Sequence, residues 1–81
     1  MTKKEIFNIL SDILKNYTDI QATMDTEIVT LGLDSLDSLE FVVDVDSRFN
    51  LQITDDELQE MFFKSKKVKQ LVEKIEKHMK K

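Results

Sequence analysis

The chain has 81 residues, which is the size of one small domain. It contains no cysteine and one histidine, which excludes a disulfide framework and a zinc site built from cysteine and histidine. The net charge of −4 is uneven, with 14 acidic and 4 basic residues in positions 1–60 but 2 acidic and 8 basic residues in positions 61–81. The acidic part argues against nucleic acid as a ligand and favours partners with a basic surface.

The first predicted element is an amphipathic helix from Lys3 to about Asn16. Thr2 and Glu5 form a capping-box signature at its start. Its apolar side chains recur at helical spacing, at Ile6, Ile9, Leu10, Ile13, Leu14 and Tyr17. A charged beginning of this kind is not signal-like, and no apolar run is long enough to span a bilayer, so we expect a cytoplasmic protein.

A long connection follows over residues 18–33 and lacks clean periodicity. We expect its own apolar side chains to pack it against the domain. It ends at Gly32, the only glycine of the chain. A second helix is predicted from Ser35 to Arg48 or Phe49, with Asp34 as its N-cap.

Two further helices complete the expected fold. A short third helix runs from about Asp55 to Phe62 or Phe63 behind a capping box of Thr54 and Glu57. A fourth runs from about Lys66 to His78, with an apolar stripe on one face and lysines on the other. The prediction is an all-α four-helix bundle, with three longer helices and a short third one, forming a single domain over residues 1–81.

The second helix has more apolar positions than one core needs. Its broad apolar sector is formed by Phe41, Val42, Val45 and Phe49, and the opposite stripe is acidic, formed by Asp37, Glu40 and Asp44. Leu36 and Val43 flank the acidic stripe. Two interpretations stay open: both side chains are buried in a wide core, or they form an apolar patch that docks partners among carboxylates.

Ser35 is a poor candidate for catalysis, because a nucleophilic serine needs a base. The only histidine, His78, is far away in the sequence and suits the negative end of a helix dipole instead. Asp34 and Asp37 could orient the hydroxyl but have no histidine through which to remove its proton. Gly32 is not part of the Gly-x-Ser-x-Gly motif that forms a nucleophile elbow. Ser35 is a better place to attach a group beside free helix amides, although the spacing alone favours a plain role for Ser35 as the N-cap or first residue of the helix.

The stretch Leu31–Phe41, with its Leu-Gly, Asp-Ser-Leu and acidic residues, resembles the phosphopantetheine attachment motif of acyl carrier proteins. The resemblance continues through residues 48–50 and 53–58 and extends over the first and last helices, so it covers essentially the whole chain. It implies a four-helix carrier that is not an enzyme. It also implies that a separate phosphopantetheinyl transferase, working with Mg²⁺, attaches a 4′-phosphopantetheine arm to Ser35.

The same resemblance implies roles for further residues. Asp34 would help the transferase place its metal or the hydroxyl, and the arm's thiol would hold acyl groups as thioesters. The positions that meet partner enzymes in the family are occupied here by Leu36, Asp37, Glu40, Val43 and Asp44. The acyl chain would be sheltered among Phe41, Val45, Met61 and Leu71. The implied partners are the transferase and enzymes that make or transfer acyl groups, met by a monomer that holds no metal of its own.

Several positions depart from the family pattern. The stretch 61–67 looks like a long link, Asp44 and Arg48 replace other residue types, Thr54 replaces a common proline, and the last helix is basic. These departures leave fatty-acid biosynthesis and a specialised polyketide, peptide or lipid pathway both open. The basic helix is either a solvated face or a contact for anionic lipid or an acidic partner.

A different class of function fits the same features. An unmodified helical module would use the carrier fold only to bind a partner protein. In that case partner binding would survive the loss of the Ser35 hydroxyl and fail on charge reversal at Glu40 and Asp44. The sequence does not specify the acyl group.

Overall fold

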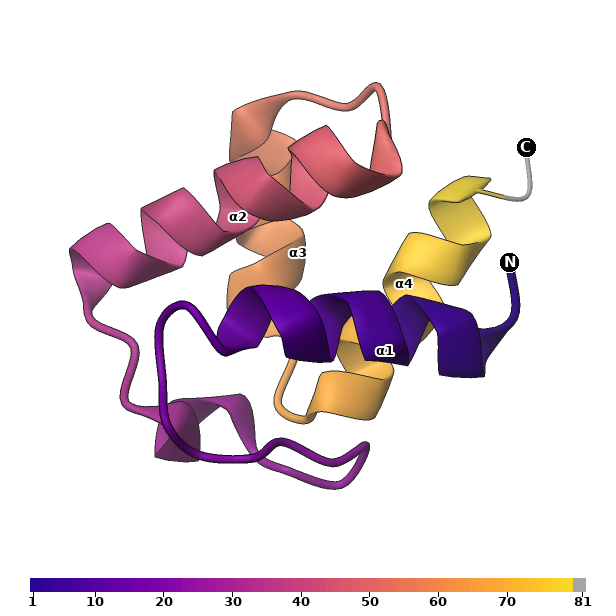
Figure 1. Cartoon of the computed structure of the whole chain (residues 1–81). Helices are drawn as coiled ribbons and strands as arrows, with labels where there is room; N and C mark the ends of the chain where they lie inside the picture. The colour runs from indigo at the N-terminus through magenta and orange to yellow at the C-terminus, as the bar shows by residue number, and fades with distance from the viewer. Residues whose placement is uncertain (80–81) are drawn as a thin grey trace.

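The computed structural model describes residues 1–79 of the chain. Four α-helices and one short 3₁₀ helix make up the fold: α1 (Lys3–Leu14), η1 (Ile28–Leu31), α2 (Ser35–Phe49), α3 (Asp55–Lys64) and α4 (Val68–Met79). α1 and α2 run in opposite directions, and α4 packs on α1 while α3 lies against α2 (Figure 1). The predicted all-α four-helix bundle is therefore confirmed. Within the described residues, none of these helices has the length and apolar character needed to cross a membrane.

The helix starts follow the capping residues of the sequence. Thr2 and Glu5 form a complete capping box, in which each side chain accepts a hydrogen bond from the other residue's backbone N–H, at 3.2 and 2.9 Å. Thr54 Oγ1 accepts from the N–H of Glu57 at 3.1 Å and begins α3. These bonds satisfy amides that a helix start otherwise leaves free, so the starts are fixed by local sequence.

Helix ends differ from the prediction. α1 stops at Leu14 rather than Asn16, because the backbone N–H groups of Tyr17 and Thr18 turn back to the Leu14 carbonyl. α3 continues to Lys64, and the buried Ser65 hydroxyl donates to the Met61 carbonyl at 2.9 Å just beyond its last turn. The link before α4 is therefore only residues 65–67, so the long link expected over 61–67 was wrong.

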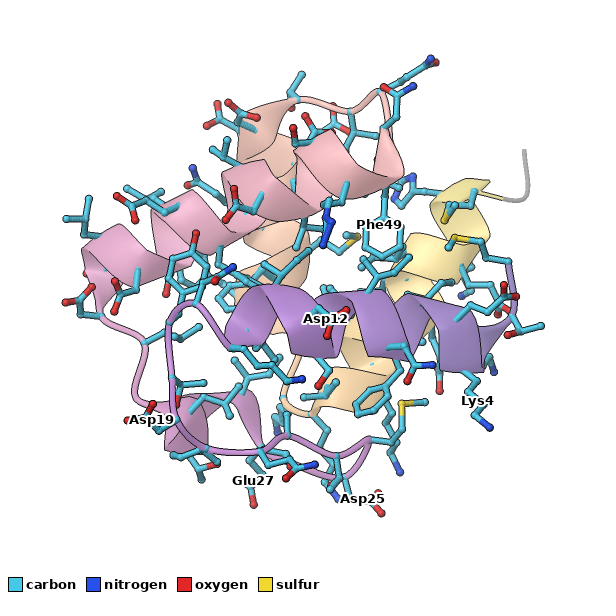
Figure 2. All side chains as sticks on the ribbon, viewed as in Figure 1. Lys4, Asp12, Asp19, Asp25, Glu27 and Phe49 are labelled. Carbon is cyan, nitrogen blue, oxygen red and sulfur yellow. The ribbon has the colours of Figure 1, made fainter. Side chains whose placement is uncertain are left out.

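The core lies between all four helices. Its most completely buried side chains come from each of them: Phe41, Ile6, Leu10, Leu58, Ile75, Val42, Val45 and Val72. Phe41 and Phe62 pack with ring centroids 5.3 Å apart and so join α2 to α3. Phe49 points into the space between α2 and α4 (Figure 2). The apolar sector predicted for the second helix is thus the face that builds the core.

The connection before α2 is fastened to the start of α4. The N–H of Ile28 donates to the Lys66 carbonyl at 2.8 Å, and the N–H of Val68 donates to the Thr26 carbonyl at 3.0 Å. The N–H of Lys69 reaches the Met24 carbonyl at 2.9 Å. Ala22, Ile28 and Leu31 are buried beneath this contact, as expected of a packed connection, whereas the labelled acidic side chains of the segment point outward (Figure 2). These contacts hold the approach to α2 in place.

Candidate cofactor-attachment site

Ser35 is the first residue of α2 and is exposed to solvent. Asp34 is the N-cap, as predicted, because its Oδ1 accepts a hydrogen bond of 2.8 Å from the N–H of Asp37. Its carbonyl accepts from the N–H of Ser38 at 2.9 Å. Since Asp34 alone supplies the cap, the Ser35 hydroxyl has no part in starting the helix and faces solvent.

Gly32 sets the direction in which the chain enters this site. It closes η1 with φ of 74°, a left-handed conformation that side chains with a Cβ rarely adopt. A Cβ added there would meet no heavy atom within 4 Å. The glycine is therefore required for its backbone conformation and not for space.

The surroundings of Ser35 fit a phosphodiester group. The backbone amides of Ser35 and Leu36 lie in the first turn of α2, where a helix leaves its N–H groups without an intrahelical acceptor. The positive end of the helix dipole favours a negative group at the same place. An arm linked through phosphate to this hydroxyl would thus find free donors without any rearrangement of the fold.

The exposed face of α2 begins beside Ser35. Leu36 is 64% exposed, Val43 is 53% exposed and Leu39 is 41% exposed, so none of the three belongs to the core. Among them stand Glu40, which is exposed, and Asp37, which is half-buried. Of the two interpretations left open by the sequence, the wide core is therefore wrong, and α2 carries apolar side chains among carboxylates on its outer face.

Tyr17 joins this face from the turn that follows α1, a role that the sequence pattern did not reveal. Its hydroxyl donates a hydrogen bond to the Asp44 carboxylate, and its ring packs edge-on against Phe41 with centroids 6.1 Å apart. The hydrogen bond to Asp44, with burial and the nearby acidic charges, raises the pKa of Tyr17 to about 12. Asp44, one of the residues expected to face partner enzymes, is half-buried and held by Tyr17. The spacing of apolar residues places Tyr17 only in the apolar stripe of the first helix and does not indicate a bond to Asp44.

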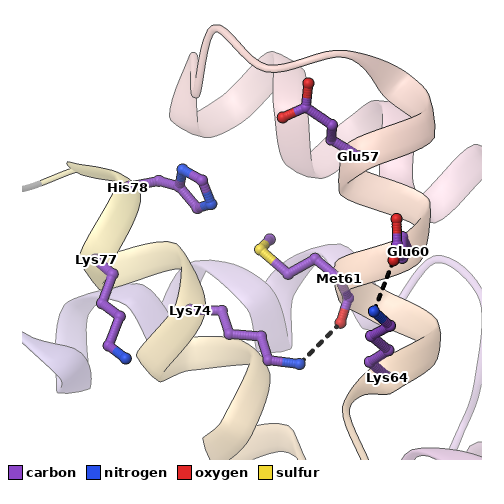
Figure 3. A pocket seen from close by; sticks show the side chains of 7 residues that line it. All are labelled: Glu57, Glu60, Met61, Lys64, Lys74, Lys77 and His78. Carbon is purple, nitrogen blue, oxygen red and sulfur yellow. Dashed lines mark hydrogen bonds and ion pairs between the residues drawn. The ribbon is translucent and has the colours of Figure 1, made fainter.

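The only histidine is remote from Ser35. His78 lies in the last turn of α4, and the end of α4 and the start of α2 occupy opposite ends of the bundle (Figure 1). Its ring faces a cleft of about 340 Å³ between α3 and α4 (Figure 3). The same cleft holds an ion pair between Lys64 and Glu60 at 2.6 Å and a contact of 3.4 Å from Lys74 Nζ to the Met61 carbonyl. This arrangement supplies Ser35 with no histidine base.

Comparison with known proteins agrees with this geometry. A family model described as a phosphopantetheine attachment site matches residues 4–75. The acyl carrier protein of Coprothermobacter proteolyticus is 32% identical over 83 residues, which cover 98% of this chain and 96% of that protein. The acyl carrier protein of Lactobacillus acidophilus is 30% identical over 65 residues, or 75% of this chain and 81% of that protein.

A plant relative differs in length. Acyl carrier protein 1, chloroplastic, of Spinacia oleracea is 33% identical over 63 residues, which cover 73% of this chain. The match spans 46% of the spinach protein, about half of its length. The similarity therefore extends over the helical domain, and over nearly all of a bacterial relative.

Proposed function

The chain belongs to the family of phosphopantetheine-attachment domains to which acyl carrier proteins belong, and from this premise we propose that it carries acyl groups as thioesters on an arm attached to Ser35. Proteins of this family carry covalently attached 4′-phosphopantetheine, and they are carriers rather than catalysts. The observation that carries the proposal for Ser35 is its exposed hydroxyl at the first position of α2, next to the capping carboxylate of Asp34. The proposed carrier domain comprises residues 1–81.

Attachment needs a separate transferase with coenzyme A as donor. The Ser35 oxygen bonds to the phosphorus of the arm, the nucleotide half of coenzyme A leaves, and the serine proton is released. Asp34 supports this step because its Oδ1 caps the helix, which leaves Oδ2 to face the hydroxyl or the transferase's metal ion. The free amides of the first turn then donate hydrogen bonds to the phosphodiester oxygens.

Partner enzymes are proposed to dock on the outer face of α2. The residues offered for this role are Leu36, Asp37, Glu40 and Val43, which combine exposed apolar side chains with carboxylates. Basic enzyme surfaces are attracted by the carboxylates and then pack on the apolar side chains. Asp44 belongs to the same stripe, but its bond to Tyr17 gives it the separate role developed below.

The acyl chain is proposed to shelter in the interior of the bundle. Phe41, Val45, Met61 and Leu71 are all buried there and offer an apolar surface. Because protein interiors are closely packed, an acyl chain must displace these side chains to enter. Loading is therefore expected to shift the packing of α2 against α3.

Wider assignments rest on the same premise. The protein is proposed to be a monomer that works in the cytoplasm. Its proposed pathway is fatty-acid biosynthesis or a related polyketide or lipid pathway. Enzymes that make or transfer acyl groups are the proposed partners. The basic surface of α4 is proposed to be solvated, since Lys77 and His78 lie in its last turn and suit the negative end of the helix dipole.

Intact-mass measurement tests the carrier function. The purified chain is incubated with coenzyme A, Mg²⁺ and a broad-specificity phosphopantetheinyl transferase. The wild type is expected to gain the mass of one phosphopantetheinyl group, and Ser35→Ala is expected to gain nothing. Ser47→Ala serves as the matched control, because Ser47 is an exposed serine on the same helix.

The alternative of an unmodified interaction module gives the opposite result. An unchanged mass of the wild type would reject the carrier proposal. Modification that persists in Ser35→Ala would reject Ser35 as the attachment residue and leave the carrier function standing.

A further inference from the structure

A surface cleft lies where the end of α1 meets the outer face of α2. It has a volume of about 330 Å³ and is lined by Tyr17, Leu39, Glu40, Val43 and Asp44. Leu39 and Val43 expose a large share of their apolar surface, and the Tyr17 ring adds an aromatic wall from the turn that follows α1. The cleft therefore joins apolar walls with a rim of two carboxylates.

The two carboxylates of the cleft are not equivalent. Asp44 is half-buried and accepts the hydroxyl hydrogen bond of Tyr17. Glu40 is exposed and makes no hydrogen bond or ion pair within residues 1–79. A basic group that approaches from solvent thus meets the exposed carboxylate of Glu40, whereas the carboxylate of Asp44 is already bonded to Tyr17.

We propose that Tyr17 determines which partners dock on α2, by holding Asp44 to the turn after α1 and leaving the cleft for an apolar side chain whose basic neighbour pairs with Glu40. This inference rests on the carrier function proposed above and specifies its docking partner. The occupant is a segment of a partner enzyme that presents an apolar side chain next to lysine or arginine.

Charge complementarity and shape together support this occupant. The apolar walls favour an apolar side chain, because packing it against Leu39 and Val43 removes exposed apolar surface from water. A basic side chain reaching for Asp44 meets a half-buried carboxylate, one oxygen of which already accepts the Tyr17 hydroxyl, whereas both oxygens of Glu40 are open to solvent. Docking is therefore selective for partners whose basic residue lies toward Glu40.

A double-mutant cycle tests the role of Tyr17. The readout is kcat/KM for transfer of the arm by a broad-specificity phosphopantetheinyl transferase with coenzyme A. Glu40→Gln is expected to lower this value about fivefold, the upper range for one exposed ion pair. Asp44→Asn is expected to lower it less than about twofold in the wild-type background, but about fivefold beside Tyr17→Phe, where the freed carboxylate becomes available.

A matched pair of valines tests the apolar wall. Val43→Ala is expected to lower kcat/KM about threefold, while Val29→Ala leaves it unchanged, since Val29 is 82% exposed but lies in η1, outside the cleft. Urea unfolding and circular dichroism establish that each variant is folded before its rates are compared.

Three results would overturn the proposal. One is a loss from Asp44→Asn as large as that from Glu40→Gln in the wild-type background. Another is an equal effect of Asp44→Asn with and without Tyr17→Phe. The third is sedimentation of the wild type as a dimer that Val43→Ala returns to monomer, because a second copy would then occupy the cleft. If the wild type gains no arm at all, the carrier proposal fails together with this inference.

Discussion

The carboxylate of Asp34 accepts a hydrogen bond of 2.8 Å from the backbone N–H of Asp37 and thereby starts α2 immediately before Ser35. The neighbour of the proposed attachment residue is therefore also the cap of the helix that carries it. Any substitution of Asp34 acts on two quantities, the stability of the fold and the rate of arm transfer. Two substitutions separate them.

Asp34→Ala is expected to lower the free energy of unfolding by about 1 kcal/mol, because it removes the acceptor of the cap. Asp34→Asn keeps an acceptor and is expected to cost only a few tenths of a kcal/mol. Both are expected to slow the mass gain with transferase and coenzyme A, because both remove the negative charge. An Asp34→Asn chain that is modified as fast as wild type would show that the charge has no part in transfer.

Gly32→Ala is expected to destabilise the fold by about 1–2 kcal/mol, the cost of a Cβ in left-handed backbone. Since a Cβ at Gly32 has open space around it, no steric clash adds to this cost. Gly32→Asn is expected to cost less, because asparagine tolerates this conformation better. Urea unfolding of the wild type and the two variants measures their free energies of unfolding. An alanine variant as stable as the wild type would contradict the prediction.

Tyr17 is expected to titrate far above an ordinary tyrosine. It is the only tyrosine of a chain without tryptophan, so tyrosinate absorbance in the near ultraviolet reports it alone. The midpoint is expected near the raised pKa of about 12 in the folded chain, and near the ordinary value of about 10 in urea. Asp44→Asn should lower the folded value, because the bond to Asp44 is the main cause of the shift.

The same shift predicts a pH dependence of stability. Because the folded pKa of Tyr17 lies above the unfolded value, its contribution is fully present below a pH of about 10. It is lost as the pH rises toward about 12. Urea unfolding across this range should show a steeper alkaline loss for the wild type than for Tyr17→Phe, which lacks the hydroxyl. Parallel curves would contradict the assignment.

Most of the fold was predictable because its signals are local. The caps at Thr2, Asp34 and Thr54 act on amides only three residues away, so sequence spacing found every helix start that they control. The core face of α2 followed from the helical spacing of its apolar residues alone. Lys64 and Ser65 were misjudged, because the end of α3 has no glycine or proline to mark it.

The site was less predictable wherever two distant segments meet. The position and exposure of Ser35 follow from local chemistry. The engagement of Asp44 by Tyr17 does not, because the two residues are 27 positions apart and only the packing of α1 on α2 brings them together. A carboxylate on a helix looks the same in sequence whether solvent or a hydroxyl holds it.

Charge reversal on α2 should weaken the approach of partner enzymes. Glu40→Lys is expected to lower kcat/KM of the transferase about fivefold or more at low salt, with the difference shrinking as salt rises. Asp12→Lys is the matched control, because Asp12 is an exposed carboxylate on α1, away from the outer face of α2 (Figure 2). Equal losses in both variants would mean that net charge, and not the α2 face, governs the encounter.

Hydrogen exchange should reveal the fastening of the connection to α4. The amides of Ile28, Val68 and Lys69 are expected to be protected like those of helix interiors, because each donates to a carbonyl of the other segment. Val29 is the internal comparison, since its side chain is 82% exposed and no such cross-segment bond involves its amide among the described residues. Exchange of Val68 as fast as Val29, measured residue by residue with NMR, would contradict this contact.

The bonds between residues 24–28 and 66–69 also bear on the order in which the chain matures. A nascent chain releases the Asp34–Ser35 segment long before Lys66, yet the approach to that segment acquires its final hydrogen bonds only when the start of α4 arrives. The approach to the segment proposed for modification therefore gains these bonds only once residues 66–69 have been synthesised. During synthesis, a transferase that requires the finished surface meets it only after translation has passed Lys69.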